Sequence, residues 1–230
     1  QNLTISNCHI IGNTYGVTLT GSLSKKSSSN KIFNNQFEKQ YVAGVRARYT
    51  DSLEVFGNSM KGFTGSSATG IDLYGNDFFK ISKNKIFECK QGMYSSNSNL
   101  NSNSFSEGSI VVNNMMSGTY GAIRTVDDFY IKYHHNSLMA GTSGINISFY
   151  SAGGNLDVRN NIISCNNPNG SACNLGPHTP ADSLVIDYNL YHHAGKIASV
   201  GSIYPSLAAW QLGDTTKNQH SIEGDPEFAS

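Results

Sequence analysis

Arginine, aspartate and tyrosine recur at fixed distances after a small residue in this chain. Gly44-Val45-Arg46-Ala47-Arg48 shows the pattern, and further copies carry Asp72, Tyr74, Tyr94 and Arg124 at the same places. The rigid fork of N–H donors on arginine suits carboxylate and sulfate groups. The flat face of tyrosine suits a sugar ring. These residue types at this spacing fit a surface that binds acidic sugars. They equally fit a structural alternative, a solvated sheet face with cross-strand pairs such as Arg46 with Asp72.

The side chains of this set are expected to share one direction. The residues between them are apolar, and in a strand alternate residues point to opposite faces. With the apolar residues inward, positions two and four after the small residue point outward. The first outward column is predicted to contain Thr18, Arg46, Asp72, Tyr94, Arg124, Asn146 and Asn174. The second is predicted to contain Thr20, Arg48, Tyr74, Ser96, Val126, Ser148 and Gly176. Arg48, Tyr74, Tyr94 and Asn146 are the candidate substrate-binding residues.

A second repeat precedes each copy of the first. It has the form apolar-x-apolar-x-x-Asn-x-apolar, as in Leu53, Val55, Asn58 and Met60. The asparagines at this place are Asn35, Asn58, Asn84, Asn136, Asn161 and Asn189. Cys8 takes the position in the first copy. Between Asn84 and Asn136 both Asn103 and Asn114 fit, and the sequence does not choose between them.

Short strands that repeat every 22 to 30 residues, without helices, are typical of a solenoid. Helical repeats and the longer blades of propellers do not fit this pattern. We therefore predict an all-β, right-handed parallel β-helix of about eight rungs over residues 1–200, with residues 201–230 as a C-terminal capping segment. Asparagine tolerates sharp turns and bonds to nearby backbone. Stacked about 4.8 Å apart, its amides would form an Asn ladder.

Composition limits the classes of function. Lys plus Arg and Asp plus Glu both number 16, so the formal net charge is zero. A general nucleic-acid binder would show a basic excess, and no apolar run is long enough to span a membrane. Nucleic acid and membrane insertion are therefore not expected.

With its rungs and Asn ladder the chain resembles the right-handed parallel β-helix proteins of the pectate lyase and alginate lyase-like superfamily. The end segment is similar to that of bacterial secreted members, with a Trp-containing helix over "SLAAWQLG" and a His-Ser-x-x-x-Asp-Pro turn that includes His220. The resemblance implies a substrate groove along one sheet. It also implies that Arg124 or Arg46 acts as base or carboxylate clamp, and that Asp72 acts as acid or calcium ligand.

Other candidate groups are weaker. Asp127 and Asp128 are adjacent, so a strand would point them apart, and a turn role is the preferred interpretation. The pairs His134-His135 and His192-His193 have no acidic or cysteine partner at ligand spacing, so no metal site is predicted. Cys165 and Cys173 flank a loop-like stretch, and both a disulfide and free thiols fit the sequence.

Two functions are consistent with these observations. The first is a polysaccharide-binding or lyase-like module of a larger secreted or cell-surface protein, without a certain cofactor apart from possible calcium. The second is a non-catalytic stalk of a bacterial surface protein. Gln1 is not an initiator methionine and Leu3 already lies in a predicted strand, so flanking domains are expected.

Overall fold

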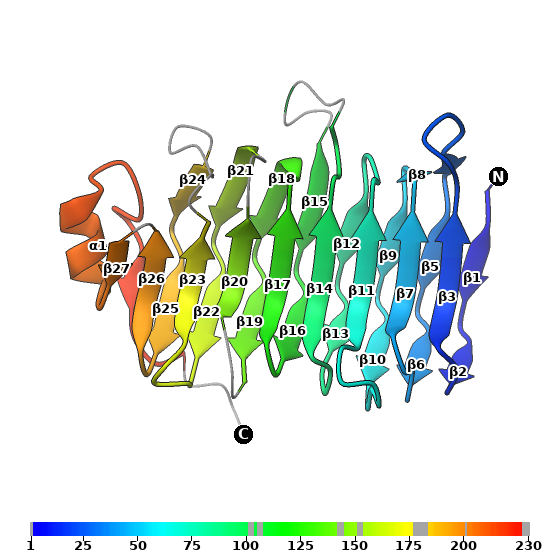
Figure 1. Ribbon diagram of the computed structural model, residues 1–230, viewed down its shortest axis with the longest axis horizontal. Helices are drawn as coiled ribbons and strands as arrows, with labels where there is room; N and C mark the ends of the chain where they lie inside the picture. Colours follow the sequence, from blue (N-terminus) through cyan, green and yellow to red (C-terminus); the bar gives the residue numbers. More distant parts are fainter. Residues whose placement is uncertain are drawn as a thin grey trace.

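The computed structural model describes residues 2–100, 104, 108–141, 145–150, 154–176, 184–200 and 202–226. The chain coils into a parallel β-helix in which three sheets enclose a narrow core (Figure 1). In the described residues sheet A contains eight parallel strands, sheet B contains nine, and sheet C contains eight with one further antiparallel strand, which agrees with about eight predicted rungs. Residues equivalent in the two sequence repeats lie on neighbouring turns, so the predicted architecture is confirmed.

Each turn contributes one strand to each sheet. Sheet A contains β1 (Thr4–Ser6), β5 (Lys31–Phe33), β9 (Glu54–Phe56), β12 (Lys80–Ser82), β15 (Ser109–Val112), β18 (Phe129–His134), β21 (Gly154–Arg159) and β24 (Leu184–Asp187). Sheet B contains β2 (His9–Ile11), β6 (Gln36–Glu38), β10 (Ser59–Lys61), β13 (Lys85–Ile86), β16 (Met115–Gly118), β19 (Ser137–Ala140), β22 (Ile162–Cys165), β25 (Leu190–His193) and the short final strand β28 (Ile222–Glu223).

Sheet C has longer strands and forms the broad face seen in front in Figure 1. It contains β3 (Tyr15–Thr20), β7 (Ala43–Arg48), β11 (Thr69–Tyr74), β14 (Gln91–Ser96), β17 (Gly121–Val126), β20 (Ile145–Tyr150), β23 (Ser171–Leu175), β26 (Lys196–Val200) and the antiparallel β27 (Ser202–Tyr204). The pair β4 (Ser27–Ser28) and β8 (Thr50–Asp51) forms a separate two-stranded sheet.

The core consists of the inward residues that alternation predicts. Leu53, Val55 and Met60 have no exposed surface, and Ile71 and Leu73 on sheet C are equally buried. Because equivalent residues of successive turns stack along the axis, each turn covers the apolar surface of the next. The core is therefore continuous along the molecule.

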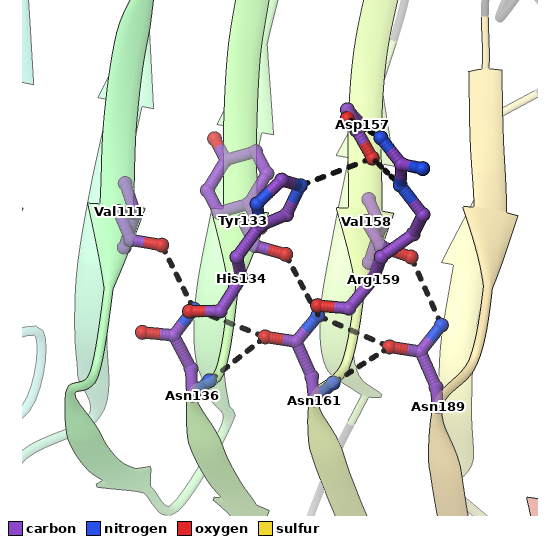
Figure 2. Close-up of polar contacts among 9 residues, drawn as sticks. All are labelled: Val111, Tyr133, His134, Asn136, Asp157, Val158, Arg159, Asn161 and Asn189. Atoms are coloured by element: carbon purple, nitrogen blue, oxygen red, sulfur yellow. Dashed lines mark hydrogen bonds and ion pairs between the residues drawn. The ribbon is translucent and has the colours of Figure 1, made fainter.

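Buried asparagines form a ladder at the corner between sheets A and B. In each step the Oδ1 atom of one asparagine accepts hydrogen bonds from the backbone N–H and the Nδ2 of the asparagine one turn earlier. Figure 2 shows Asn136 and Asn161 in this arrangement, with both bonds at 3.0 Å. The Nδ2 atom also donates to the backbone of the preceding turn, as Asn136 does to Val111 at 2.9 Å. All six predicted members take part.

The structure decides the register that the sequence left open. Asn114 occupies the ladder between Asn84 and Asn136, because its Oδ1 accepts from Asn84 at 3.0 Å and its Nδ2 donates to Asn136 at 3.0 Å. Asn103, the other candidate, lies outside the described residues. The longer segment between β14 and β15 is thus inserted at a different corner from the ladder.

Both ends of the ladder use other residues. The backbone N–H of Cys8 donates to Asn35 Oδ1 at 2.9 Å, and that of Asn189 donates to Ser221 Oγ at 3.0 Å. Ser221 belongs to the predicted closing turn. Helix α1 (Leu207–Gly213) follows its N-cap Ser206, whose hydroxyl accepts from Ala209 N–H.

The predicted Trp210 packing is observed. Its side chain is fully buried against Tyr191 of β25 and against Tyr204. In the described part of the chain no helix is long and apolar enough to cross a bilayer. The four cysteines are free thiols, with Cys8 exposed and Cys89, Cys165 and Cys173 buried, so the structure contains no bond between Cys165 and Cys173.

A second, mixed polar stack lies at the corner between sheets C and A. Thr50 donates from its backbone N–H and its hydroxyl to Asn76 Oδ1, at 2.8 and 2.7 Å. Two turns further on, the N–H of Ser98 donates to Asp128 Oδ1 at 2.7 Å. This corner contains threonine, asparagine, serine and aspartate, whereas the ladder contains asparagine alone. The second stack therefore leaves no repeat that could be predicted from the sequence.

Candidate functional site

The arginines and tyrosines of the sequence pattern lie on the outward face of sheet C. Strand register places Arg46 beside Asp72, Asp72 beside Tyr94, and Tyr94 beside Arg124. Arg48, Tyr74, Ser96 and Val126 form the second column in the same way. We call these outward side chains of β7, β11, β14 and β17 the arginine–tyrosine face. Its columns have the order that the spacing predicts.

Arg46 is held by two residues, Tyr15 and Asp72. Its guanidinium lies over the ring of Tyr15, 4.7 Å from the centroid, and its Nη1 donates to the Tyr15 hydroxyl. Its Nε lies 3.5 Å from Asp72 Oδ2. The cross-strand pair considered as a structural alternative is therefore present. Contacts of this kind fix the guanidinium in place before any ligand arrives.

The other two arginines also stack on tyrosines. The Cζ atom of Arg48 is 5.5 Å from the ring centroid of Tyr74, and that of Arg124 is 5.8 Å from that of Tyr94. The face thus carries three ordered guanidinium groups and one carboxylate. The excess of positive charge favours an acidic ligand.

Asp72 is partly withdrawn from water among these residues. Burial raises the pKa of its carboxyl above the usual value, and the charges of Arg46 and Arg48 offset this only in part. A carboxyl group that ionises less readily leaves the surrounding charge more positive at mildly acidic pH.

The predicted outward position of Asn146 is wrong. The sequence places Gly144 at the small-residue position of this copy, but Arg124 pairs with Ser148, so Asn146 itself stands there. There the chain turns in from sheet B and the side chain points into the protein. Asn146 is fully buried, and its Nδ2 donates to the carbonyls of Leu138 and Ser164 at 2.7 and 2.8 Å. Such a side chain presents nothing to a ligand on the face.

Two tyrosines of this region were missed from sequence. Tyr15 stands at the first position of its strand, where the chain bends at the corner and alternation no longer predicts direction. Tyr49 follows Arg48 at a turn with a φ of 52°. Its ring meets that of Tyr74 edge to face, with centroids 5.4 Å apart. The available signal was a bulky residue at a position where the next three turns have Gly75, Asn97 and Asp127.

One histidine of each pair contacts a carboxylate, His134 with Asp157 and His193 with Glu223. Figure 2 shows His134, with its Nε2 3.1 Å from Asp157 Oδ1, on the outward side of sheet A. Arg159 donates to the same carboxylate from Nε and Nη2, at 2.6 and 2.5 Å. Among the described residues no group of three His, Cys, Asp or Glu side chains could hold a metal ion.

The remaining candidates have roles within the fold. Asp127 occupies a turn with a φ of 55°, while Asp128 is buried, so the pair points apart as predicted. Ser164 Oγ lies 3.2 Å from His192 Nδ1, and His193 Nε2 lies 3.2 Å from Glu223. The ring of His220 stacks on Tyr188 and its Nδ1 lies 2.7 Å from Asp187.

Comparison with known proteins identifies the fold. A family model described as "Right handed beta helix region" matches residues 1–123. A solved structure titled "The complex structure of XylC with xylose" has a TM-score of 0.51 at 13% identity and covers 78% of this chain and 29% of its own. The A-module of mannuronan C-5 epimerase AlgE6 from Azotobacter vinelandii has a TM-score of 0.56 at 11% identity, covering 98% of this chain and 59% of its own. This chain therefore spans less than two thirds of either structure. No curated protein matches the sequence.

Proposed function

Because the chain belongs to the right-handed β-helix family, we propose that it uses the outward side of sheet C to bind an acidic polysaccharide. The observation that carries the proposal is the arginine–tyrosine face, in which three guanidinium groups lie over tyrosine rings. Parallel strands are about 4.8 Å apart, so its contacts repeat along the solenoid axis. An extended glycan lying along that axis would meet donors for its carboxylates and aromatic rings for its sugars.

The geometry favours binding over catalysis. An arginine is protonated at physiological pH, and Arg46 is further engaged by Asp72 and Tyr15, so it is a poor proton acceptor. Asp72 and Arg124 are separated by the strand that carries Tyr94. They therefore lie too far apart to act on one carbon atom, and both arginines are better suited to hold carboxylates.

Calcium is not well accommodated on this face. Ca²⁺ takes six to eight oxygen ligands, usually with several carboxylates among them. Asp72 is the one carboxylate among the outward side chains of β3, β7, β11, β14 and β17, and it is paired with Arg46. We therefore propose a calcium-independent interaction, which binding in the presence of EDTA would test.

The two similar structures support a carbohydrate ligand. One contains xylose and the other belongs to an enzyme named for mannuronan. At 13% and 11% identity this likeness shows the fold alone, so the choice of an acidic glycan depends on the charge of the face. A secreted or cell-surface location would accord with such a ligand.

The decisive experiment is binding to a panel of acidic and neutral polysaccharides by affinity gel electrophoresis. The double change Arg46→Ala with Arg124→Ala should weaken binding of an acidic glycan at least about tenfold, since charge-assisted contacts contribute about 1.5–3 kcal/mol each. The control is Lys80→Ala with Lys85→Ala, which removes the same charge from exposed positions on the other two sheets.

Two outcomes would overturn the proposal. Retention by no acidic glycan would favour the alternative of a non-catalytic stalk. Equal loss in both double variants would show that net charge, and not this face, is responsible. Release of unsaturated uronate, followed by ultraviolet absorbance, would instead indicate a lyase.

A further inference from the structure

A small pocket lies at the corner where sheet C turns toward sheet A, next to the arginine–tyrosine face. It has a volume of about 160 Å³, below the ~300 Å³ of most small-molecule sites. Its walls include Leu23, Lys26, Tyr49, Tyr74, Asp77 and Leu100. Tyr74 also belongs to the face, so a ligand on the face would pass beside this opening. The size suits a single sugar ring.

Tyr49 occupies a backbone conformation that the fold does not require of a tyrosine. Its φ is 52°, and the equivalent turn positions on the next two turns hold Gly75 and Asn97, at φ values of 64° and 54°. Left-handed backbone is unfavourable for a bulky residue. Other turns of this protein also hold tyrosine in this conformation, at Tyr130 and Tyr188, so the neighbours of Tyr49 distinguish it.

The next turn is shaped to admit the Tyr49 ring. A Cβ atom added at Gly75 would lie 2.8 Å from two carbon atoms of that ring. The ring is therefore seated over a glycine and set against Tyr74 at an interplanar angle of 89°. Two aromatic surfaces at right angles form one side of the pocket.

Apolar surface is exposed on the loops that flank these rings. Leu23 is 76% exposed after β3, and Leu100 is 54% exposed after β14, although both line the same pocket. Exposed leucines that converge on one pocket are a feature of ligand sites. The C–H face of a pyranose ring would cover them.

The polar groups of the pocket balance in charge. Lys26 Nζ forms an ion pair with Asp77 Oδ2, so neither group offers an uncompensated charge. Asp77 Oδ1 is buried and has no hydrogen-bond partner among the described residues. A buried acceptor without a donor is unfavourable. The pocket therefore suits an uncharged polar ring better than a uronate.

We propose that this pocket is a separate subsite for one uncharged pyranose ring, an inference that rests on the proposed glycan-binding function of the adjoining face. The arginine–tyrosine face would hold the acidic part of a glycan, and the corner pocket would hold a neutral sugar at its side. The substrate class is then a heteropolysaccharide that carries both acidic and neutral sugars.

The test is saturation-transfer NMR with free xylose, glucose and glucuronate as probes. Wild-type protein should transfer saturation to xylose or glucose, and Tyr49→Gly should reduce this signal about tenfold through loss of the aromatic contact. This variant relieves the left-handed strain, so it should fold. The matched control is Tyr188→Gly, which removes an exposed tyrosine at a φ of 55° from the asparagine corner and should leave the signal unchanged.

The two proposals fail separately. An undiminished neutral-sugar signal in Tyr49→Gly, or no signal from either neutral sugar with wild type, would overturn the subsite whatever the acidic glycans do. Loss of acidic-glycan binding in the Arg46→Ala, Arg124→Ala protein should leave the neutral-sugar signal intact. A neutral-sugar signal that vanished in that double variant would overturn the separation of the two sites.

Discussion

The Asp157 carboxylate on sheet A shows how a single residue can make stability depend on pH. Burial raises the pKa of Asp157, but the hydrogen bonds and charges of His134 and Arg159 outweigh it and lower the pKa to about 2. The folded state therefore binds fewer protons than the unfolded state below pH ~4. The stabilisation is present above that pH and is lost as the pH falls toward 2.

Asp157→Asn should lower the free energy of unfolding by about 1–2 kcal/mol at pH 7. This loss is smaller than the pKa shift of Asp157 alone would imply, because the Arg159 side chain is 40% exposed and solvent screens its charge. Urea unfolding at several pH values measures this loss. The difference in unfolding free energy between wild type and variant should shrink below pH ~3. A difference that is constant with pH would contradict the assignment.

Asp128 should have the opposite pH dependence. Complete burial raises its pKa to about 7, and the hydrogen bonds from Ser98 and Ser95 lower the pKa only in part. The folded state favours the neutral acid, so stability is greatest below pH ~4 and falls as the pH rises through about 7.

Asp128→Asn should therefore stabilise the protein by about 2–4 kcal/mol at pH 8 and change little at pH 4. The amide has a precedent at this corner, where Asn76 Nδ2 donates to the Ala47 carbonyl at 3.0 Å. Thermal unfolding at the two pH values is the measurement. Asp127→Asn on the same turn is the control, and a similar gain there would refute the explanation.

At the scale of elements, the Asn ladder was predictable and the arginine–tyrosine face was predictable only in part. The ladder has one residue type at one position of each turn, so it is visible as a sequence repeat. Each asparagine is buried because its amide bonds to the backbone and to the asparagine of the next turn. Asn146 shows the limit, because a slip of two residues preserves the alternation of directions. Only the buried environment at the corner between sheets B and C distinguishes the two registers.

Asn136→Ala should destabilise the protein by about 2–4 kcal/mol. The change leaves the Asn114 backbone N–H and Nδ2 without their acceptor and removes the donors to Val111 and Asn161. Denaturant unfolding measures the effect. The matched control is Asn160→Ala, at a turn position with a φ of 57° that lies one turn later and outside the ladder. This change should lower the free energy of unfolding by less than half as much.

At the scale of the whole molecule, stability is expected to be local along the axis. Each turn contacts mainly its neighbours, so the end turns depend on what covers them. Trp210 supplies that cover at one end, with no exposed surface and rings of Tyr191 and Tyr204 about 6 Å away. The sequence predicted this contact because the solenoid core must be closed by something apolar.

Trp210→Ala should cost about 3–5 kcal/mol, concentrated at the C-terminal end. Hydrogen exchange should lose protection in β25 and β26 while β7 and β11 keep theirs. Uniform loss of protection along the solenoid would show that the molecule unfolds as a single cooperative unit.

The bonding of the ladder also has a consequence for how such a chain can change in length. Asn58 and Asn84 stand 26 residues apart and make the same contacts one turn apart. Removing residues 59–84 would bring Asn58 directly before Lys85 and beside Asn114, with every strand still facing an equivalent partner. Removing one residue within a strand would instead turn the apolar side chains that follow it in that strand outward. Length changes that cross the strands should therefore be accommodated as whole turns, and the arginine–tyrosine face could be lengthened or shortened by recombination without redesigning the core.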